Sequence, residues 1–413
     1  MKFFYNTGVR LYWLAIYFAG FFNEKARKWR SGRTDFFAKL ERAFGDVKQP
    51  VAWFHCASLG EFEQGRPVIE AFRQKQPGYR ILLTFFSPSG YEVRKTYPGA
   101  DYVFYLPLDT PANARRFLKI IKPVLAVFVK YEFWYNYLQW LNNAGVPTYL
   151  ISGVFRPGHY FFKWYGRWFR QKLHYYRKIF VQDARSAELL KNAGIDNAEL
   201  TGDTRFDRVT VIAAEQKSDS KTEKFKNGMK LWICGSTWDE DEKIISAAYH
   251  KICRSGEKIK LLIVPHEIEE SHILRLQILF PEAIRYSNAG DAELRGSGVM
   301  VVDTVGLLSS LYRYGDIAYI GGGFGRGIHN LPEAAVYGIP VIFGTNYGKV
   351  VEAGELIRRG GGFSVATEDE LNKLVLHFIG DDAYRRSCGQ AAKDYILSGV
   401  GATGRIISVI AGH

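Results

Sequence analysis

The sequence predicts two Rossmann-like α/β domains in tandem. Its 413 residues exceed the roughly 100–200 residues of one ordinary domain. Short β-branched and aromatic runs alternate with longer helical stretches, which is typical of a doubly wound fold around a parallel sheet. A polar, lysine-rich stretch over residues 213–228 interrupts this alternation and indicates a linker between the two domains.

The first 33 residues combine an aromatic run with basic residues. Residues 11–22 are almost wholly apolar, and five Lys or Arg side chains follow between positions 25 and 33. The run is shorter than the ~20 residues that a helix needs to cross a bilayer. No small-residue cleavage site of a signal peptide follows it. This pattern favours a segment lying on an anionic membrane surface. The alternative is a helix packed against the body of the protein.

Residues 34–212 form the first predicted domain. The apolar run Val124–Val129 is continuous, as in a parallel strand buried on both faces. Helices are expected over Ala112–Ile121 and Phe133–Asn143. The expected strands are Val51–Cys56, Ile81–Phe86, Tyr102–Tyr105, Val124–Val129, Thr148–Ile151 and Lys178–Gln182.

Residues 229–413 form the second predicted domain, whose last helix could pack back on the first. In open parallel sheets ligands bind beyond the carboxyl ends of the strands, so residues that directly follow strands are the candidates for a site. With two such domains we expect those ends to face a common cleft. The expected strands are Leu231–Gly235, Ile259–Val264, Val299–Asp303, Ile317–Ile320 and Val341–Phe343.

Composition narrows the function without choosing it. An apolar content of 47% and a charged content of 23% are those of a folded globular protein, which excludes a disordered chain. The net charge of +13 favours an anionic partner, whether nucleic acid, acidic lipid or phosphorylated substrate. The four cysteines form no CxxC pair, so neither a zinc site nor a disulfide framework is expected.

Three segments of the first domain carry candidate catalytic side chains. Glu61 follows the first strand, where a carboxylate could accept a proton; on position alone, a role in complementing the helix dipole is somewhat more probable. Lys130 and Glu132 follow the strand that ends at Val129, and a site and a surface ion pair are equally good interpretations. Arg205 could neutralise a leaving phosphate, or it could belong to an exposed charged turn.

The glycine-rich segment Gly321–Glu333 is the strongest candidate in the second domain. It follows a strand and leads into a helix with Pro332 near its start, so its backbone could approach a phosphate at a helix N-terminus. It contains no GK[ST] of a Walker A motif. Two further segments follow strands. Gly235–Thr237 could form an anion-binding turn or simply cap the next helix. His266 could contact a nucleotide, but it is a weaker candidate than Gly321–Glu333.

Several ordered blocks together resemble the bacterial 3-deoxy-D-manno-octulosonic acid (Kdo) transferases of lipopolysaccharide synthesis, glycosyltransferase family 30. The blocks are HCASLGE (His55–Glu61), LPLDTPANARRFL (Leu106–Leu118), GDTRFD (Gly202–Asp207), GST (Gly235–Thr237), DTVGLL (Asp303–Leu308) and GGG…HNLPEAA (Gly321–Ala335).

This resemblance implies a GT-B fold and transfer of Kdo from CMP-Kdo to the lipid A precursor lipid IVA, at the cytoplasmic face of the inner membrane. It implies that Glu61 accepts the proton and that Arg205 stabilises the transition state, with Glu132 and Lys130 beside them. It implies that CMP contacts Pro265, His266, Val305, Gly306, Leu307, Asn330 and Glu333. The matching segments add further candidates for substrate binding, namely Ser58, Gly60, Gly235, Ser236, Thr237, Gly322, Gly323 and His329.

The chain departs from the family pattern at three places. Lys130 stands where many relatives have a glutamate. Pro265-His266-Glu267 replaces Pro-Arg-His, so an arginine near the nucleotide is missing, and Gly306-Leu307-Leu308 replaces Gly-Glu-Leu.

The expected reaction is a displacement with inversion that needs no metal and no cofactor. Glu61 deprotonates a lipid hydroxyl, while Arg205 and the helix terminus after Asn330 offset charge on the departing phosphate. One alternative is a GT-B enzyme that uses a UDP-sugar on a lipid carrier. A weaker one is a non-enzymatic basic membrane protein that binds nucleotide or nucleic acid; no nucleic-acid motif is present, so no nucleic-acid partner is expected. The sequence predicts no particular oligomeric state.

Overall fold

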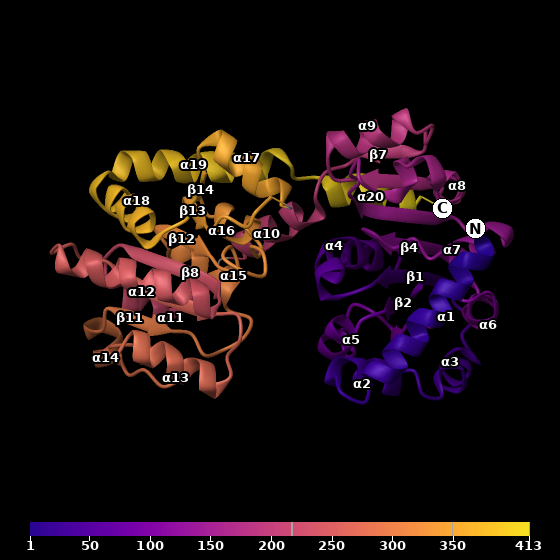
Figure 1. The fold of residues 1–413 in the computed structure, drawn as a ribbon, viewed down its shortest axis with the longest axis horizontal. Coiled ribbons are helices and arrows are strands. Elements are labelled where there is room, and N and C mark those ends of the chain that lie inside the picture. The colour runs from indigo at the N-terminus through magenta and orange to yellow at the C-terminus, as the bar shows by residue number, and fades with distance from the viewer. Residues whose placement is uncertain (216–217, 349, 413) are drawn as a thin grey trace. The chain divides into compact units, whose positions relative to one another are not determined.

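The structure, a computed structural model, describes residues 1–215, 218–348 and 350–412, and it divides the chain into two compact units. Unit 1 comprises Met1–Asp207 together with the segment from Gly401 onward, and unit 2 comprises Arg208–Val400. Each unit holds one seven-stranded sheet in which every pairing is parallel (Figure 1). This confirms the predicted class of two Rossmann-like doubly wound domains.

The sheet of unit 1 has the strand order β3-β2-β1-β4-β5-β6-β7. All the strands predicted for this domain are present, and β7 is an addition that the sequence did not predict. At three residues β7 is too short to give a recognisable pattern. The strands are β1 Val51–Cys56, β2 Arg80–Phe85, β3 Tyr102–Tyr105, β4 Pro123–Val129, β5 Thr148–Gly153, β6 Lys178–Val181 and β7 Ala198–Leu200.

Both faces of this sheet are covered by apolar cores. Consecutive side chains of a strand point to opposite faces, so Trp53 enters one core and its neighbour Phe54 enters the other. The C-terminal helix α20 completes the second core with Ile406 and Ile410, and it therefore belongs to unit 1. The helices of unit 1 are α1 Lys2–Ala19, α2 Glu24–Ser31, α3 Phe36–Phe44, α4 Leu59–Lys75, α5 Pro88–Arg94, α6 Pro111–Ile121, α7 Tyr135–Asn143, α8 Arg167–Leu173, α9 Ala184–Asn192, α20 Ala402–Ile410 and the start of α10 Thr204–Ala214.

Helix α1 lies on the surface of unit 1 (indigo in Figure 1) and buries none of its residues completely. The Tyr5 hydroxyl fixes it by donating a hydrogen bond of 2.6 Å to the buried carboxylate of Asp109. Its other side leaves large aromatic side chains in solvent, among them Phe4 and Phe18. Of the helices in the described ranges, none has the length and apolar character required to span a bilayer.

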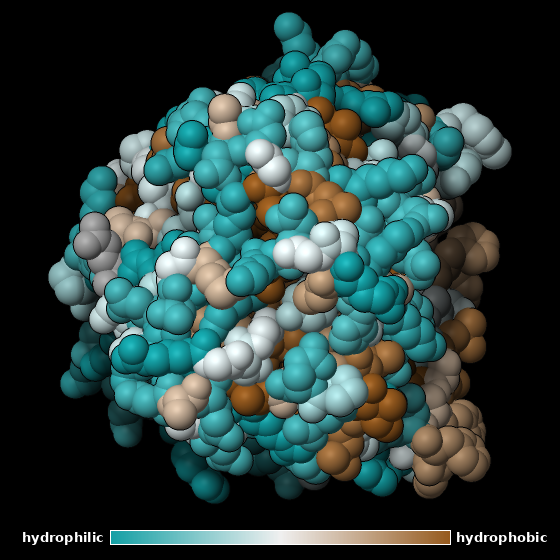
Figure 2. Space-filling view, turned by 90° about the vertical axis from the view of Figure 1, so that its left-hand side faces the viewer, coloured by the Kyte–Doolittle hydropathy of each residue, from teal (hydrophilic) through white to brown (hydrophobic). Residues whose placement is uncertain are grey.

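The sheet of unit 2 has the strand order β10-β11-β9-β8-β12-β13-β14. The five predicted strands are present; β10 and β14, of two and three residues, were missed for the same reason as β7. The face of unit 2 shown in Figure 2 is mainly hydrophilic, with scattered apolar patches. The strands are β8 Leu231–Thr237, β9 Lys260–Pro265, β10 Ile284–Arg285, β11 Val299–Val301, β12 Ile317–Ile320, β13 Val341–Phe343 and β14 Gly362–Ser364.

The segment predicted as a linker contains regular structure. Residues 216 and 217 lie outside the described residues, but helix α11 (Ser220–Lys226) occupies much of the remainder. Asp219 caps it, and Phe225 is fully buried against unit 2. A single buried aromatic among polar residues is a weak sequence signal, which is why the sequence pattern indicated a linker instead of a helix. The other helices of unit 2 are α12 Asp239–Arg254, α13 Glu270–Leu279, α14 Asp291–Gly296, α15 Leu308–Leu311, α16 Pro332–Ala335, α17 Val351–Arg359, α18 Glu368–Gly380 and α19 Asp382–Ser398.

Each sheet has one point where the direction of strand addition reverses. In unit 1 it lies between β1 and β4, and in unit 2 between β8 and β12. Open α/β sheets bind ligands beyond the carboxyl ends of the strands at such switch points. Glu61 in the first turn of α4 follows β1, and Lys130 follows β4. Gly235–Thr237 are the last three residues of β8, and Gly321–Asn330 follow β12. The topology thus brings the candidate residues of each unit to the place where ligands bind in this class of fold.

Candidate functional site

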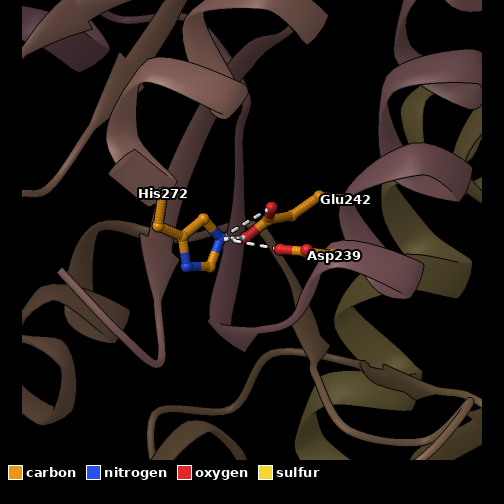
Figure 3. A group of neighbouring side chains, drawn as sticks. All are labelled: Asp239, Glu242 and His272. Atoms are coloured by element: carbon orange, nitrogen blue, oxygen red, sulfur yellow. Dashed lines mark hydrogen bonds and ion pairs between the residues drawn. The ribbon is translucent and has the colours of Figure 1, made fainter. Parts of the chain in front are cut away.

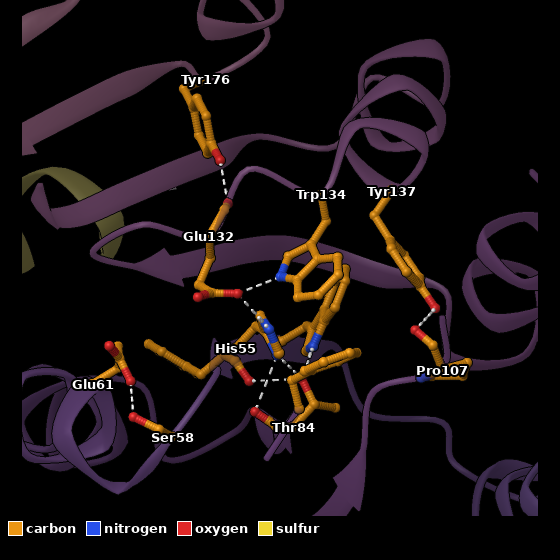
Figure 4. A network of polar contacts seen from close by, with 12 residues as sticks. His55, Ser58, Glu61, Thr84, Pro107, Glu132, Trp134, Tyr137 and Tyr176 are labelled. Carbon is orange, nitrogen blue, oxygen red and sulfur yellow. Dashed lines mark hydrogen bonds and ion pairs between the residues drawn. The ribbon is translucent and has the colours of Figure 1, made fainter. Parts of the chain in front are cut away.

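Glu61 lies in the first turn of α4, directly after the loop that follows β1. Ser58 is the N-cap residue of this helix, and its hydroxyl donates a hydrogen bond to the Glu61 carboxylate (Figure 4). The backbone N–H groups of Phe86 and Ser87 both donate to the Ala57 carbonyl, which fixes the loop. Glu61 is partly exposed, so its carboxylate is both held in place and accessible.

Lys130 occupies the other side of the same switch point, at the end of β4. Its backbone is in the left-handed region, with φ of 69°, and its N–H donates to the Ile151 carbonyl at 2.9 Å. Burial of the ammonium lowers the pKa of Lys130, and the nearby Arg205 charge lowers it further; Glu61 and Asp203 act in the opposite direction. Lys130 therefore lies within electrostatic reach of both Glu61 and Arg205.

Arg205 is held by a carboxylate of its own loop. Its Nε lies 3.0 Å from Oδ2 of Asp203, and a second guanidinium nitrogen contacts the same oxygen. Asp203 also accepts a hydrogen bond from the Arg205 backbone N–H at the start of α10. In the same block, Asp207 accepts hydrogen bonds from the N–H groups of Gly401 and Thr403, which attaches α20 to unit 1. The block therefore contains one candidate functional cation and a structural anchor.

Glu132 points inward, into a buried polar network. Its carboxylate accepts a hydrogen bond from the Trp134 indole N–H and lies 3.1 Å from Nε2 of His55 (Figure 4). The other ring nitrogen of His55 lies 2.8 Å from the Thr84 hydroxyl on the neighbouring strand. The Tyr176 hydroxyl donates to the Glu132 backbone carbonyl at 2.8 Å. Glu132 thus supports the loop that carries Lys130, while its carboxylate is only 6% exposed.

His55 and Thr84 are residues that sequence reasoning missed as a functional pair. The available signal was a histidine within the fully buried strand β1, where a polar side chain requires a partner. The partner, Thr84, lies on β2, so it could not be identified before the strand pairing was known.

In unit 2 the glycine-rich loop packs against the protein's own backbone. Gly322 has φ of 91°, and its N–H donates to the buried Asp241 carboxylate at 2.8 Å. A Cβ on Gly323 would lie 2.4 Å from the backbone nitrogen of Gly344. The Asp241 carboxylate also accepts from the Tyr319 hydroxyl at 2.8 Å. The sequence assigned these glycines to close approach by a phosphate; the structure shows that close approach within the protein already requires them.

Three rings from three different loops form a stack at the carboxyl end of β8 and its neighbours. The His266 ring stacks on both Trp238 and His329, with each centroid distance at 4.4 Å, and the Trp238 and His329 centroids lie 6.2 Å apart. The Trp238 indole N–H donates to Nε2 of His329 at 3.0 Å. Burial lowers the pKa of both histidines, that of His329 to about 4, so both rings are neutral near pH 7. The sequence proposed His266 and His329 separately, but it gave no indication that Trp238 joins them.

The remaining predicted nucleotide contacts surround this stack along the same edge of the sheet. Asn330 donates to the Glu333 carboxylate at 2.7 Å, and the amide oxygen of Asn330 is buried with no hydrogen-bond partner among the described residues. Val305 is 75% exposed, and the glycine after it has φ of 86°. Pro265 ends β9, Leu307 precedes α15, and Ser236 adopts φ of 54° beside Gly235 and Thr237.

One expectation about this edge needs correction. The helix predicted after Asn330 is α16, and it contains only the four residues Pro332–Ala335. A macrodipole comes from aligned peptide units, so a single turn supplies much less positive potential than the sequence suggested. Side-chain cations must therefore carry more of the neutralisation of any bound phosphate.

A separate group lies where α12 meets α13: Asp239, Glu242 and His272 (Figure 3). Within the described ranges it is the one His/Cys/Asp/Glu group close enough to hold a metal ion. His272 Nε2 lies 2.9 Å from Glu242, whose other oxygen accepts from the Thr237 hydroxyl at 2.8 Å. Arg275 already contacts Asp239, and Nδ1 of His272 has no acceptor of the kind that orients a metal-bound imidazole. These contacts favour an internal network that joins two helices.

Comparisons with known proteins converge on one family. A sequence model described as 3-deoxy-D-manno-octulosonic-acid transferase (kdotransferase) matches residues 31–208. The 3-deoxy-D-manno-octulosonic acid transferase of Aquifex aeolicus is 30% identical over 77% of this chain and 83% of its own length. That of Haemophilus influenzae is 25% identical over 96% of this chain and 95% of its own.

Solved structures show the fold alone. A UDP-GlcNAc 2-epimerase from Neisseria meningitidis bound to UDP-GlcNAc aligns with a TM-score of 0.62 at 15% identity, over 88% of this chain and all of that chain. A glycosyltransferase from Rickettsia africae aligns with a TM-score of 0.59 at 13% identity, over 88% of this chain and 98% of that chain. These likenesses agree with the GT-B class, two Rossmann-like domains in one chain.

Proposed function

Because this chain belongs to the 3-deoxy-D-manno-octulosonic acid transferase family, we propose that it transfers Kdo from CMP-Kdo to a hydroxyl of the lipid A precursor in lipopolysaccharide synthesis. The observation that carries the assignment to this chain is the group formed by Glu61, Lys130 and Arg205 at the switch point of unit 1. A carboxylate that is oriented by the Ser58 hydroxyl and lies within electrostatic reach of Lys130 is suited to act as a general base.

Glu61 takes the proton of the acceptor hydroxyl. That oxygen forms a bond to the anomeric carbon of Kdo, the bond from that carbon to the phosphate oxygen breaks, and its electron pair leaves with CMP. The hydroxyl of Ser58 orients the Glu61 carboxylate. Lys130 and Arg205 provide positive charge beside the acceptor oxygen as the proton departs. The reaction inverts the configuration at the anomeric carbon and requires no metal.

Unit 2 takes the donor nucleotide. Strands β8 and β12 flank its switch point, and the loops after β8, β9 and β12 hold the ring stack and the turn beginning at Gly322. The buried, unpartnered amide oxygen of Asn330 offers a hydrogen-bond acceptor to the amino group or hydroxyls of the nucleoside. Glu333, bound to Asn330, holds that amide in position.

The acceptor is a lipid, and α1 provides an apolar surface for it. A hollow of about 290 Å³ lies between α1 and the loops that carry Phe86 and Trp134. A second, of about 270 Å³, shares Tyr12 and Phe86 with the first and continues towards α2. Phe86 donates its N–H to Ala57, next to the Ser58–Glu61 turn, so both hollows adjoin the catalytic loop. Acyl chains fit such apolar grooves, which supports a lipid acceptor.

We infer that α1 and α2 rest on the anionic cytoplasmic face of the bacterial inner membrane. Exposed aromatics, including the 95% exposed Phe22, would enter the interface, while the basic residues of α2 face lipid phosphates. Binding to vesicles with 30% anionic lipid, lost in vesicles of neutral lipid or at high salt, would support this location. Equal binding to both vesicle types would contradict it.

The test of activity is incubation of the full chain with CMP-Kdo and the lipid A precursor, followed by mass spectrometry of the lipid. One or more Kdo increments, with equimolar CMP release, are expected, and they also give the number of Kdo residues added. UDP-sugars offered in parallel serve as the comparison. Product from a UDP-sugar and none from CMP-Kdo would overturn the proposed donor.

A further inference from the structure

Arg326 is an exposed arginine in the glycine-rich loop, between Gly325 and Gly327. Its guanidinium carbon lies 3.8 Å from the centroid of the Trp238 ring, which is van der Waals contact over the face of the indole. Trp238 in turn stacks on His266. The guanidinium therefore covers a face of the indole that belongs to the ring stack, at the carboxyl edge of the sheet of unit 2.

Stacking leaves the hydrogen-bonding capacity of Arg326 unused. Within the described ranges no carboxylate or carbonyl accepts a hydrogen bond from it. Three other arginines of unit 2 are paired with carboxylates: Arg285 with Glu270, Arg358 with Glu355, and Arg385 with Asp382. A guanidinium has five N–H donors in a planar fork that matches phosphate oxygens. A stacked guanidinium without a carboxylate is thus pre-organised for an anion.

The groups around Arg326 contribute little positive charge of their own, so the charge of Arg326 dominates there. The three rings beneath it are neutral near pH 7, because burial lowers the pKa of His266 and His329. The nearby helix α16 has a single turn and little dipole. In this stack Arg326 is the member with a permanent charge.

We propose that Arg326 binds the phosphate of the cytidine nucleotide donor, with its guanidinium held flat on Trp238. The inference rests on the proposed function, which makes that donor CMP-Kdo. As the glycosidic bond breaks, the phosphodiester with one negative charge becomes a phosphate monoester that carries up to two. A cation fixed beside those oxygens stabilises the transition state more than the bound substrate.

The experiment compares CMP and cytidine binding by calorimetry in the wild-type protein, Arg326→Ala and Arg326→Lys. Loss of a charge-assisted bidentate contact should weaken CMP binding about 10- to 100-fold in Arg326→Ala and leave cytidine unchanged. Arg326→Lys keeps the charge but not the fork or the planar stack, so its loss should be smaller. KM for CMP-Kdo should rise, and kcat should fall as well. The side chain is exposed and makes no core contact, so thermal melting should not change.

Arg254 gives the matched control. It is also exposed, lies in the same unit, and ends α12, about 22 Å along the helix from Asp239 at the helix start. Arg254→Ala removes the same charge and should leave CMP affinity within about twofold of wild type, since exposed charges separated by more than a Debye length are largely screened.

Three results would overturn the proposal: unchanged CMP affinity in Arg326→Ala, an equal loss in Arg254→Ala, or an effect confined to CMP-Kdo. The last would assign Arg326 to the carboxylate of the sugar. These outcomes are separate from the fate of the proposed function. If the wild-type protein yields no Kdo-lipid, the proposed transfer fails, whereas the CMP titration of the variants still decides the role of Arg326.

Discussion

Replacing Glu61 by Gln tests the proposed general base with little change in shape. Gln keeps the volume of the side chain and can still accept a hydrogen bond from the Ser58 hydroxyl, but it cannot take a proton. Glu63→Gln is the matched control, because Glu63 lies two residues further along the same helix and pairs with Arg94 at 2.9 Å instead. Both variants lose one carboxylate from α4, and only one of them loses the proposed base.

The expected magnitudes differ widely. General base catalysis typically contributes 10²–10⁴-fold, so the Glu61→Gln barrier should rise by about 2.7–5.5 kcal/mol. The stability cost should stay near ~1 kcal/mol, since a single hydrogen bond at a partly exposed carboxylate changes. Glu63→Gln loses a partly exposed ion pair, worth about 0–1 kcal/mol of stability, and should keep its turnover.

Single-turnover formation of Kdo-lipid, measured by mass spectrometry with saturating CMP-Kdo, isolates the chemical step. Calorimetry with CMP checks that the donor site is intact, because Glu61 belongs to unit 1 and the nucleotide loops belong to unit 2. If Glu61→Gln turns over within about threefold of Glu63→Gln, the reasoning that Glu61 takes the proton is refuted.

Three further changes probe the loop, the surface and the pH response. Gly323→Ala should lower the melting temperature and CMP affinity together, since its Cβ would meet the Gly344 backbone nitrogen at 2.4 Å; unchanged melting would contradict this close packing. Phe18→Ser with Phe21→Ser should weaken vesicle binding at least tenfold without altering CMP affinity, because both rings are about 60% exposed. The folded-state pKa of His329, about 4, lies below its ordinary 6.5, so its contribution to stability is present above pH 6.5 and is lost as pH falls towards 4. The melting temperature of His329→Gln should therefore fall less than that of the wild type between pH 7.5 and pH 5. An equal fall in both proteins would refute the lowered pKa of His329.

The sequence was sufficient to predict the frame of both domains. Strands such as Val124–Val129 are buried on both faces, and a continuous apolar run in the sequence predicts them. The edge strands β7, β10 and β14 have two or three residues and form only because a neighbouring strand offers hydrogen-bond partners. That information is not local, so no window of sequence contains it.

The site residues that were predicted have a local sequence signal, whereas those that were missed depend on residues far away in the chain. Glu61 and Lys130 follow strands at a switch point, so the topology rule found them. The partner of Glu132 is His55, 77 residues away, and the stack of Trp238 with His329 joins residues 91 apart. Such pairs depend on strand order and register, which become known only once the sheet is assembled.

The distribution of charge in the two units decides where the leaving phosphate can be stabilised. Sequence reasoning assigned that role to Arg205 and a helix terminus. Arg205 is bound by Asp203, which offsets much of its field, and the helix is one turn long. Among the described residues no carboxylate pairs with Arg326, and Arg326 lies in the unit that holds the nucleotide loops. We propose that Arg205 instead acts on the acceptor side, within electrostatic reach of Lys130 and with its charge partly offset by Asp203.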